Sequence, residues 1–262
     1  MKPYKTTCLK GGTSGLEGRV FLKILAIESS NQTMSVATME DGLVVAEYTR
    51  NGNLQHSTQL MPAIEYVLKS SDWEPKDLDK VAVSKGPGSY TGVRIGATIA
   101  KTLAWTLNKP LVAVSSLKVL AANSMFFEGL IIPLMDARRG NLYTAGYKVI
   151  NGILEEVLAE THVASTEWFD RIDQETHSIL FIGQDIPKYE EQIRERFGNR
   201  ARFAHKNEWL PRAGILASLA KDELEEDVHT FIPEYLKKPE AEENWQKTHQ
   251  EPRKGEYVER ID

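Results

Sequence analysis

Apolar residues in the first half of the chain fall into short runs, alternations and one-sided helical spacings. The runs and alternations predict strands at 23–28, 33–39, 43–49, 81–84 and 111–114. Apolar residues three and four positions apart predict helices at 56–71, 90–107 and 117–126. Asp41-Gly42, between the second and third strands, is a hairpin signal. The first half therefore has the predicted order β-β-β-α-β-α-β-α.

The second half repeats this order. Strands are predicted at 130–136, 141–149, 153–160, 179–182 and 201–204, and helices at 166–172, 187–197 and 211–224. Asn151-Gly152 is a hairpin signal at the place that corresponds to Asp41-Gly42. We interpret 223–227 as a solvated helix end. Two tandem lobes, at 23–128 and 129–235, resemble the α/β architecture of the actin-like ATPases (the actin–Hsp70–sugar kinase class).

The stretch 80–107 reads as a strand, a glycine-rich turn and a helix, a geometry that presents backbone N–H groups to an anion. A P-loop needs a Gly-Lys-Ser/Thr ending, which this turn does not have. The dinucleotide fingerprint needs G-x-G-x-x-G, but Gly86, Gly88 and Gly92 are spaced with one residue too many. A tight turn that lets a helix lie close to a sheet is the stronger interpretation.

The helix predicted at 90–107 has few charges, since only Arg94 and Lys101 carry one. Small residues recur at every fourth position from Gly92 to Ala104 and form a stripe that allows close packing. A helix that is apolar nearly all round is buried on more than one side, so we expect a partner interface here, with the stripe facing either the partner or the sheet. The expected interface residues are Leu60, Ile64, Tyr90, Thr91, Gly92, Arg94, Ile95, Gly96, Ile99, Ala100 and Leu103.

Each predicted lobe opens with a hairpin, and in actin-like ATPases the phosphates of ATP lie between two such hairpins. The candidate nucleotide residues are Glu28, Ser29, Ser30 and Thr33 in the first hairpin and Asp136, Arg138 and Arg139 in the second. Hydroxyl groups and free N–H groups suit a phosphate, and an arginine can pair with it. The first hairpin has no glycine, so side chains crowd the approach. We expect no tightly bound cofactor, with ATP or ADP binding weakly, at roughly 0.1 mM or above, or only in an assembled complex.

Composition narrows the class of protein. The chain has 262 residues and 41% hydrophobic content, and no apolar run approaches membrane-spanning length. The single cysteine, Cys8, excludes an intrachain disulfide and indicates a reducing compartment. We interpret 1–22 as a disordered leader or expression tag and 236–262 as a tail. The whole chain has a net charge of −5 and the leader one of +3, so residues 23–262 carry −8. This negative charge argues against strong unaided nucleic-acid binding.

Several blocks of sequence carry a resemblance to a known family. They are ILAIESS, HSTQLMPAI, KGPGSYTGVRIG, AVSSL, MDARRGNLY and PEYLKKPEAE. With these blocks the chain resembles the TsaB family, also called YeaZ, from about Lys23 to Asn244. The resemblance implies a non-catalytic relative of the TsaD enzyme. Such a protein pairs with TsaD, and with the ATPase TsaE, to install threonylcarbamoyl on the adenosine next to the anticodon of tRNAs that read ANN codons. It also implies a homodimer when alone, tRNA contact only through the complex, and a cytoplasmic location.

The catalytic relative holds a metal in an H-x-x-x-H motif. The resemblance implies that these ligand positions are Ser116 and Leu120 here, and neither is a histidine. The six histidines of the chain show no pair at ligand spacing, so we expect no metal and no transfer reaction by this chain itself. No G-x-S-x-G nucleophile motif is present. Two alternatives stay open: an independent nucleotide-hydrolysing enzyme or peptidase of the glycoprotease-like family, and a homodimeric binding module.

Overall fold

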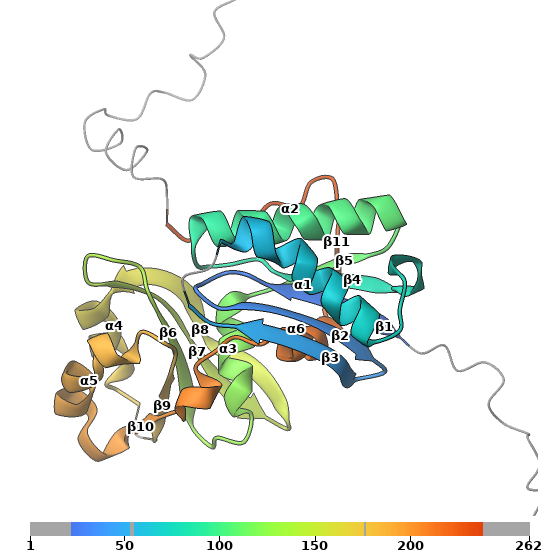
Figure 1. The fold of residues 1–262 in the computed structure, drawn as a ribbon. Helices are drawn as coiled ribbons and strands as arrows, with labels where there is room; N and C mark the ends of the chain where they lie inside the picture. Colours follow the sequence, from blue (N-terminus) through green and yellow to red (C-terminus); the bar gives the residue numbers. More distant parts are fainter. Residues whose placement is uncertain (1–21, 53–54, 176, 238–262) are drawn as a thin grey trace, which may run out of the picture.

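The computed structural model describes residues 22–52, 55–175 and 177–237, which form two α/β lobes (Figure 1). The strands are β1 (Lys23–Glu28), β2 (Met34–Glu40), β3 (Leu43–Arg50), β4 (Lys80–Ser84), β5 (Leu111–Val114), β6 (Leu130–Asp136), β7 (Asn141–Ile150), β8 (Ile153–Ala164), β9 (Ile179–Ile182), β10 (Ala201–Phe203) and β11 (Glu225–Glu226). The α-helices are α1 (His56–Ser70), α2 (Tyr90–Leu107), α3 (Ser116–Ala121), α4 (Ser165–Ile172), α5 (Glu190–Phe197) and α6 (Ala213–Ala220). The segments predicted as a leader (1–22) and a tail (236–262) lie outside the described part, except for residues 22, 236 and 237.

The order β-β-β-α-β-α-β-α occurs twice, as the sequence predicts, and the strands form two sheets. Three helices are shorter than predicted: α3 ends at Ala121, α5 begins at Glu190, and α6 extends only from Ala213 to Ala220. The interpretation of 223–227 as a helix end is wrong. Glu225 and Glu226 form β11, which pairs antiparallel with β5 and satisfies backbone groups that would otherwise lie open at a sheet edge.

The sheet of the first lobe has the order β11-β5-β4-β1-β2-β3. Its central strands β5, β4 and β1 are parallel, so their carboxyl ends meet at one edge. Side chains alternate between the two faces of the sheet. Leu25 and Ile27 pack with α1 and α2, whereas Ile24 and Ala26 pack with α6. Figure 1 shows α1 and α2 on one face and α6 on the other.

The second lobe is built in the same way. Its sheet has the order β10-β9-β6-β7-β8, and β6 and β9 are parallel neighbours. Trp168 and Phe169 of α4 and Phe197 of α5 are buried against one face. The opposite face is covered by α3, which follows β5 in the chain but packs on β6 and β7. Among the described residues, no helix is long and apolar enough to cross a membrane.

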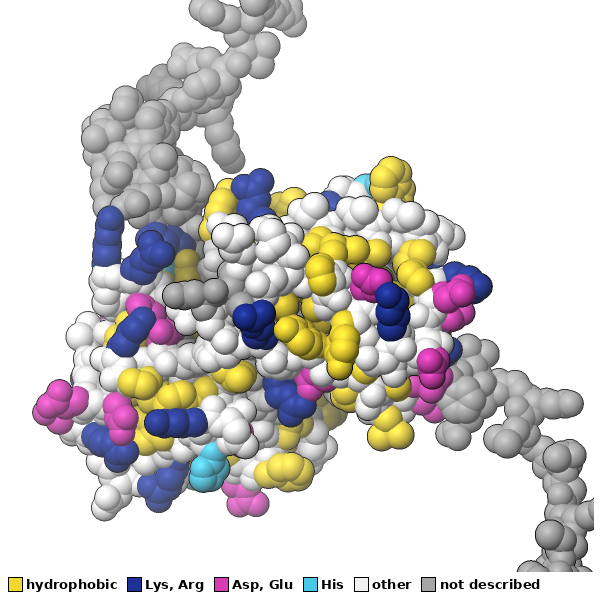
Figure 2. All heavy atoms as spheres, in the orientation of Figure 1, with side chains coloured by type: hydrophobic (Ala, Val, Ile, Leu, Met, Phe, Trp, Pro, Cys, Tyr) yellow, Lys and Arg dark blue, Asp and Glu magenta, His cyan; other side chains and the backbone are white. Residues whose placement is uncertain are grey.

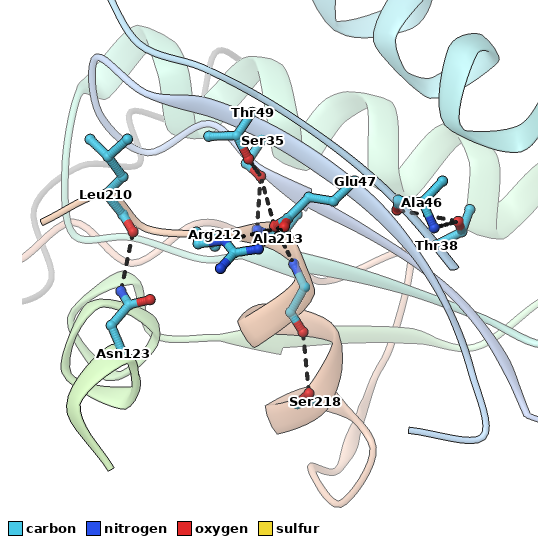
Figure 3. Close-up of polar contacts among 11 residues, drawn as sticks. Ser35, Thr38, Ala46, Glu47, Thr49, Asn123, Leu210, Arg212, Ala213 and Ser218 are labelled. Atoms are coloured by element: carbon cyan, nitrogen blue, oxygen red, sulfur yellow. Dashed lines mark hydrogen bonds and ion pairs between the residues drawn. The ribbon is translucent and has the colours of Figure 1, made fainter. Parts of the chain in front are cut away.

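The last helix crosses from the second lobe to the first. Although α6 lies within the segment predicted as the C-terminal lobe, it packs on β1 and β2 of the first sheet. Its N-terminus is held there by side chains of that sheet (Figure 3). Ala213 N donates to Ser35 Oγ at 2.9 Å, and Gly214 N donates to Glu47 Oε1 at 2.9 Å. The free N–H groups at the start of a helix favour an acidic partner. Glu47, on β3 of the first lobe, is that partner for α6.

Candidate functional site

The hairpin between β1 and β2 is closed rather than open to a ligand. Glu28, Ser29, Ser30 and Thr33 are all fully buried. Ser29 Oγ donates to Gly92 O at 2.9 Å, and Ser30 donates from both N and Oγ to Glu28 Oε1, at 2.7 and 2.5 Å. The four candidate phosphate ligands therefore bond to the protein itself, and only the hairpin tip is free to meet a ligand.

The glycine-rich turn packs directly on this hairpin. Ser89 N donates to Ser30 O at 2.6 Å. A Cβ atom placed on Gly88 would lie 2.0 Å from Ser30 O, and one on Gly92 would lie 2.2 Å from Ser29 O. Both distances are far shorter than any real carbon–oxygen contact, so only glycine fits. The interpretation of a tight turn that brings the helix close to the sheet is confirmed.

The carboxyl of Glu28 is the most deeply buried acid of this region. Its Oε1 takes both hydrogen bonds from Ser30, while its Oε2 is buried with no hydrogen-bond partner. Burial raises the pKa of Glu28 above its ordinary value, and the hydrogen bonds from Ser30 and the nearby His56 offset this only in part. An enclosed carboxyl whose accessible surface is taken up by the protein has no open side for a metal or a phosphate.

The hairpin between β6 and β7 is more open. Arg138 and Arg139 have left-handed backbone conformations and are exposed at its tip. Asp136 accepts from Arg138 N at 2.9 Å, from Tyr189 OH at 3.1 Å and from Lys188 Nζ at 2.5 Å. Burial acts to raise the pKa of Asp136, but these hydrogen bonds, that of Lys188 foremost, hold it below its ordinary value. Asp136 is therefore a carboxylate that is already paired with the ammonium group of Lys188.

A cleft of about 610 Å³ lies between the lobes. It is lined by Asp136 and Arg138 from the second hairpin, but by Asn31 and Gln32 rather than by the four candidates of the first hairpin. Arg139 is not among its lining residues. Of the residues predicted for a nucleotide cleft, this cleft takes in Asp136 and Arg138, and Asn31 and Gln32 line it from the first lobe in place of the predicted set.

The residues present do not fit a magnesium nucleotide. The sequence predicts a nucleotide with its phosphates between the two hairpins, yet Ser29 and Ser30 are enclosed and the glycine turn is packed against them. Asp136 and Asp185, the two carboxylates of the cleft, are both bonded to Lys188. Sequence reasoning missed Asp185 and Lys188, although they follow β9 much as Asp136 ends β6. Because neighbouring parallel strands bring their carboxyl ends together, that position was a usable signal.

The helical face α1–α2 was predicted as a partner interface, and the structure divides the predicted residues into three groups. Leu60, Ile64, Gly92, Gly96 and Ala100 are buried inside the lobe, so their prediction as partner contacts is wrong. The small stripe faces the sheet, where Gly96 would place a Cβ 2.2 Å from Ser29 Oγ.

The remaining predicted residues lie nearer the surface. Ile95, Ile99 and Leu103 are half-buried against the core, and Tyr90, Thr91 and Arg94 are exposed. The outward face of α2 continues with Thr98, Thr102 and Trp105, which sequence reasoning did not name. Trp105 is 66% exposed, which is a large exposed fraction for an apolar side chain. Figure 2 shows hydrophobic side chains on this part of the molecule.

One flank of α2 is covered by the segment after β11. Phe231 is buried in the core cluster under α2, and Lys101 Nζ donates to Phe231 O at 2.7 Å. The rings of Tyr90 and Tyr235 pack with their centroids 5.2 Å apart. Glu234 N donates to Lys85 O at 2.8 Å, and their side chains form an ion pair. The near absence of charge on α2 thus reflects three covered sides: the sheet, α1 and this segment.

The two positions that the resemblance pairs with metal-ligating histidines of the catalytic relative are Ser116 and Leu120, and both lie on α3. Both side chains are buried, Leu120 in the cluster that packs α3 on the second sheet. Within 22–52, 55–175 and 177–237, no group of three or more His, Cys, Asp and Glu side chains is placed to hold a metal ion. A serine hydroxyl and an aliphatic side chain supply no zinc or iron ligand set.

Comparison with known proteins decides the family. A family model described as "TsaD: tRNA N6-adenosine threonylcarbamoyltransferase" matches residues 24–245. The tRNA threonylcarbamoyladenosine biosynthesis protein TsaB of Bacillus subtilis (strain 168) is 43% identical over 224 residues, which are 86% of this chain and 98% of that protein. The chain belongs to the TsaB family. The TsaB protein of Escherichia coli (strain K12) is 34% identical over 129 residues, 48% of this chain and 55% of that protein.

Solved structures show the same fold. YeaZ from Pseudomonas aeruginosa superposes with a TM-score of 0.69 at 24% sequence identity, covering 82% of this chain and 100% of that one. The TsaB family and the two-lobed fold are therefore established by independent comparisons, of sequence and of structure.

Proposed function

We propose that this TsaB-family chain is the non-catalytic partner that a TsaD enzyme requires, together with TsaE, to install threonylcarbamoyl on the adenosine next to the anticodon of tRNAs that read ANN codons. The observation that carries the proposal is the 43% identity to a TsaB protein along 98% of that protein's length. The buried Ser116 and Leu120, which replace the histidines of the catalytic relative, support a role without transfer chemistry. The cytoplasm, where tRNA is modified, is the proposed location.

The proposed docking surface is the outward face of α2, with the neighbouring residues of α1. Tyr90, Arg94, Thr98 and Trp105 are exposed there, and the face carries little charge to desolvate on binding. In isolation the chain forms a homodimer through the same face, so homodimer and complex with TsaD exclude each other. Sedimentation of the chain alone and with TsaD checks this: a mixed complex should form as the homodimer disappears.

The decisive experiment is a reconstituted modification assay. It contains TsaD, TsaE, tRNA and the threonylcarbamoyl adenylate donor, with or without this chain. Threonylcarbamoyladenosine should accumulate only in the complete mixture. Modification at an equal rate without the chain would refute the proposal, and turnover of ATP or peptide by the chain alone would favour an independent enzyme.

Contact with tRNA is proposed to come through the complex. Residues 23–262 carry a net charge of −8, which repels the phosphate backbone. The chain without residues 1–22 should therefore bind tRNA weakly in filter binding at physiological salt. Tight, salt-sensitive binding by this form would contradict the proposal, and the leader must be absent because its +3 charge attracts tRNA by itself.

A further inference from the structure

Lys188 lies between two carboxylates at the floor of the cleft. Its Nζ is 2.5 Å from Asp136 Oδ2 and 2.8 Å from Asp185 Oδ1. Asp136 ends β6, and Asp185 and Lys188 follow the neighbouring parallel strand β9. The ammonium therefore stands where the carboxyl ends of two adjacent strands meet, in the cleft between the lobes.

The other oxygens of the two carboxylates are also fixed. Asp136 Oδ1 accepts from Arg138 N and Tyr189 OH, at 2.9 and 3.1 Å. Asp185 Oδ2 accepts from Asp136 N at 2.9 Å. Only the two oxygens that face Lys188 point at a shared position, and both lie within 3 Å of it. Two carboxylate oxygens converging on one point in a cleft are what Mg²⁺ and Ca²⁺ use in proteins.

We propose that Lys188 is a built-in cation that fills the position between Asp136 and Asp185 where a divalent metal ion would bind. The ammonium of a lysine is a compact point charge. Because the side chain tethers it beside the two carboxylates, its effective concentration there is high whatever the concentration of free cations. The carboxylates in turn raise the pKa of Lys188 above its ordinary value, so it stays charged at neutral pH. The cleft is thereby a metal-independent site: a phosphate-bearing ligand would meet Lys188 and Arg138 themselves, with no bridging ion.

This arrangement accounts for the misfit between the fold class and a magnesium nucleotide. A metal can enter only if it displaces Lys188, whose side chain is 55% exposed and free to swing out if its partners are satisfied otherwise. Removal of the ammonium leaves two carboxylates facing one point, which repel each other unless a cation replaces it. The latent site is therefore expected to appear when Lys188 alone is changed.

The test is titration of the full chain with Mn²⁺, followed by the electron paramagnetic resonance of the free ion. The wild type should show no site tighter than ~1 mM, a weak level for protein-bound divalent ions. Lys188→Gln, and independently Lys188→Met, should gain one site at least about tenfold tighter. Lys148→Gln is the matched control, because Lys148 pairs with one carboxylate, that of Glu175, and should gain none.

The double variant Lys188→Gln/Asp185→Asn separates this site from other acidic groups of the chain. It should lose the Mn²⁺ site that Lys188→Gln gains, and the melting temperature of Lys188→Gln should rise with Mn²⁺ while that of the double variant does not. Folded Lys188 variants without a Mn²⁺ site would overturn the proposal. So would a wild type that binds Mn²⁺ as tightly as they do. Neither outcome bears on pairing with TsaD, which is measured separately.

Discussion

At the scale of single residues, Glu28 has an unusual position for an acid. Its carboxyl is fully buried at the end of β1, and one of its two oxygens has no hydrogen-bond partner. An uncompensated buried charge is costly, so the neutral form is favoured and the pKa rises above the ordinary 4.5. The folded chain therefore binds this proton more tightly than the unfolded chain does.

This predicts how the stability of Glu28→Gln depends on pH. With a raised pKa in the folded state, the stabilisation from Glu28 is complete below about pH 4.5 and is lost as the pH rises through the folded-state pKa. Glutamine does not titrate. The melting temperature of Glu28→Gln minus that of the wild type should therefore increase as the pH is raised from about 5 to 8. Taking the difference between the two proteins cancels the other titrating groups. A difference that stays constant over this range would contradict the raised pKa.

A second prediction at this scale concerns Gly92. Alanine in a helix interior is favoured over glycine by about 1 kcal/mol, so propensity alone predicts that Gly92→Ala stabilises. The new Cβ would instead lie 2.2 Å from Ser29 O, a backbone atom with no freedom to move aside. We expect a loss of about 1–3 kcal/mol in the free energy of unfolding, measured by urea denaturation. Thr98→Ala, on the exposed face of the same helix, is the control and should change stability little.

At the scale of elements, α2 shows how a nearly uncharged helix can belong to a single lobe. Its small stripe packs on the sheet, its Ile95–Leu103 ridge packs toward α1, and Phe231 covers the opposite flank. Only the outward face is left for a partner, and it consists of threonines and aromatic residues rather than of the small stripe. The proposed partner binding and the folding of the lobe would thus use different faces of one helix.

Thr98→Glu tests this separation. Because Thr98 is exposed, the variant should fold with a melting temperature close to that of the wild type. Apart from Arg94 this face is uncharged, and a new carboxylate at its centre must be desolvated on binding, so affinity for TsaD and for a second copy should fall by about tenfold or more. Thr166→Glu, on the exposed face of α4, is the matched control and should pair normally. Wild-type pairing by folded Thr98→Glu would remove α2 from the interface.

At the scale of the whole molecule, the two lobes are joined by an exchange of helices. Residues of α6 contribute Ala213, Leu216 and Ala217 to the core of the first lobe. Glu47 of β3 bonds to Gly214 N and to the guanidinium of Arg212, and Asn123 Nδ2 donates to Leu210 O at 3.1 Å (Figure 3). The first lobe is therefore incomplete without α6.

The exchange predicts that a fragment of residues 23–128 does not fold by itself. Without α6, one face of its sheet would expose Ile24, Ala26 and Met39, which are fully buried in the intact chain. Circular dichroism should show no cooperative thermal transition for the fragment and a single one for the full chain. Leu216→Ala in the full chain should cost about 2–5 kcal/mol, as for other buried leucines. A fragment that melts cooperatively would show that the first lobe needs nothing from the second half.

The sequence by itself determined the order and type of the elements. Apolar periodicity and the turns at Asp41-Gly42 and Asn151-Gly152 are local properties, so β-β-β-α-β-α-β-α could be predicted twice and confirmed. The packed glycine turn could also be predicted, because its reason lies in the missing side chains of Gly88 and Gly92. The family could also be identified from the sequence, because blocks such as KGPGSYTGVRIG are contiguous runs of residues.

Only the tertiary structure decided which faces are free. Burial of Ser29 and Ser30 depends on the approach of α2, and the position of Lys188 depends on the pairing of β6 with β9. The pairing of β11 with β5 and the crossing of α6 to the first sheet join segments that are far apart in the sequence. No local pattern encodes such contacts, because their free energy comes from burying surfaces that meet only once the chain has folded.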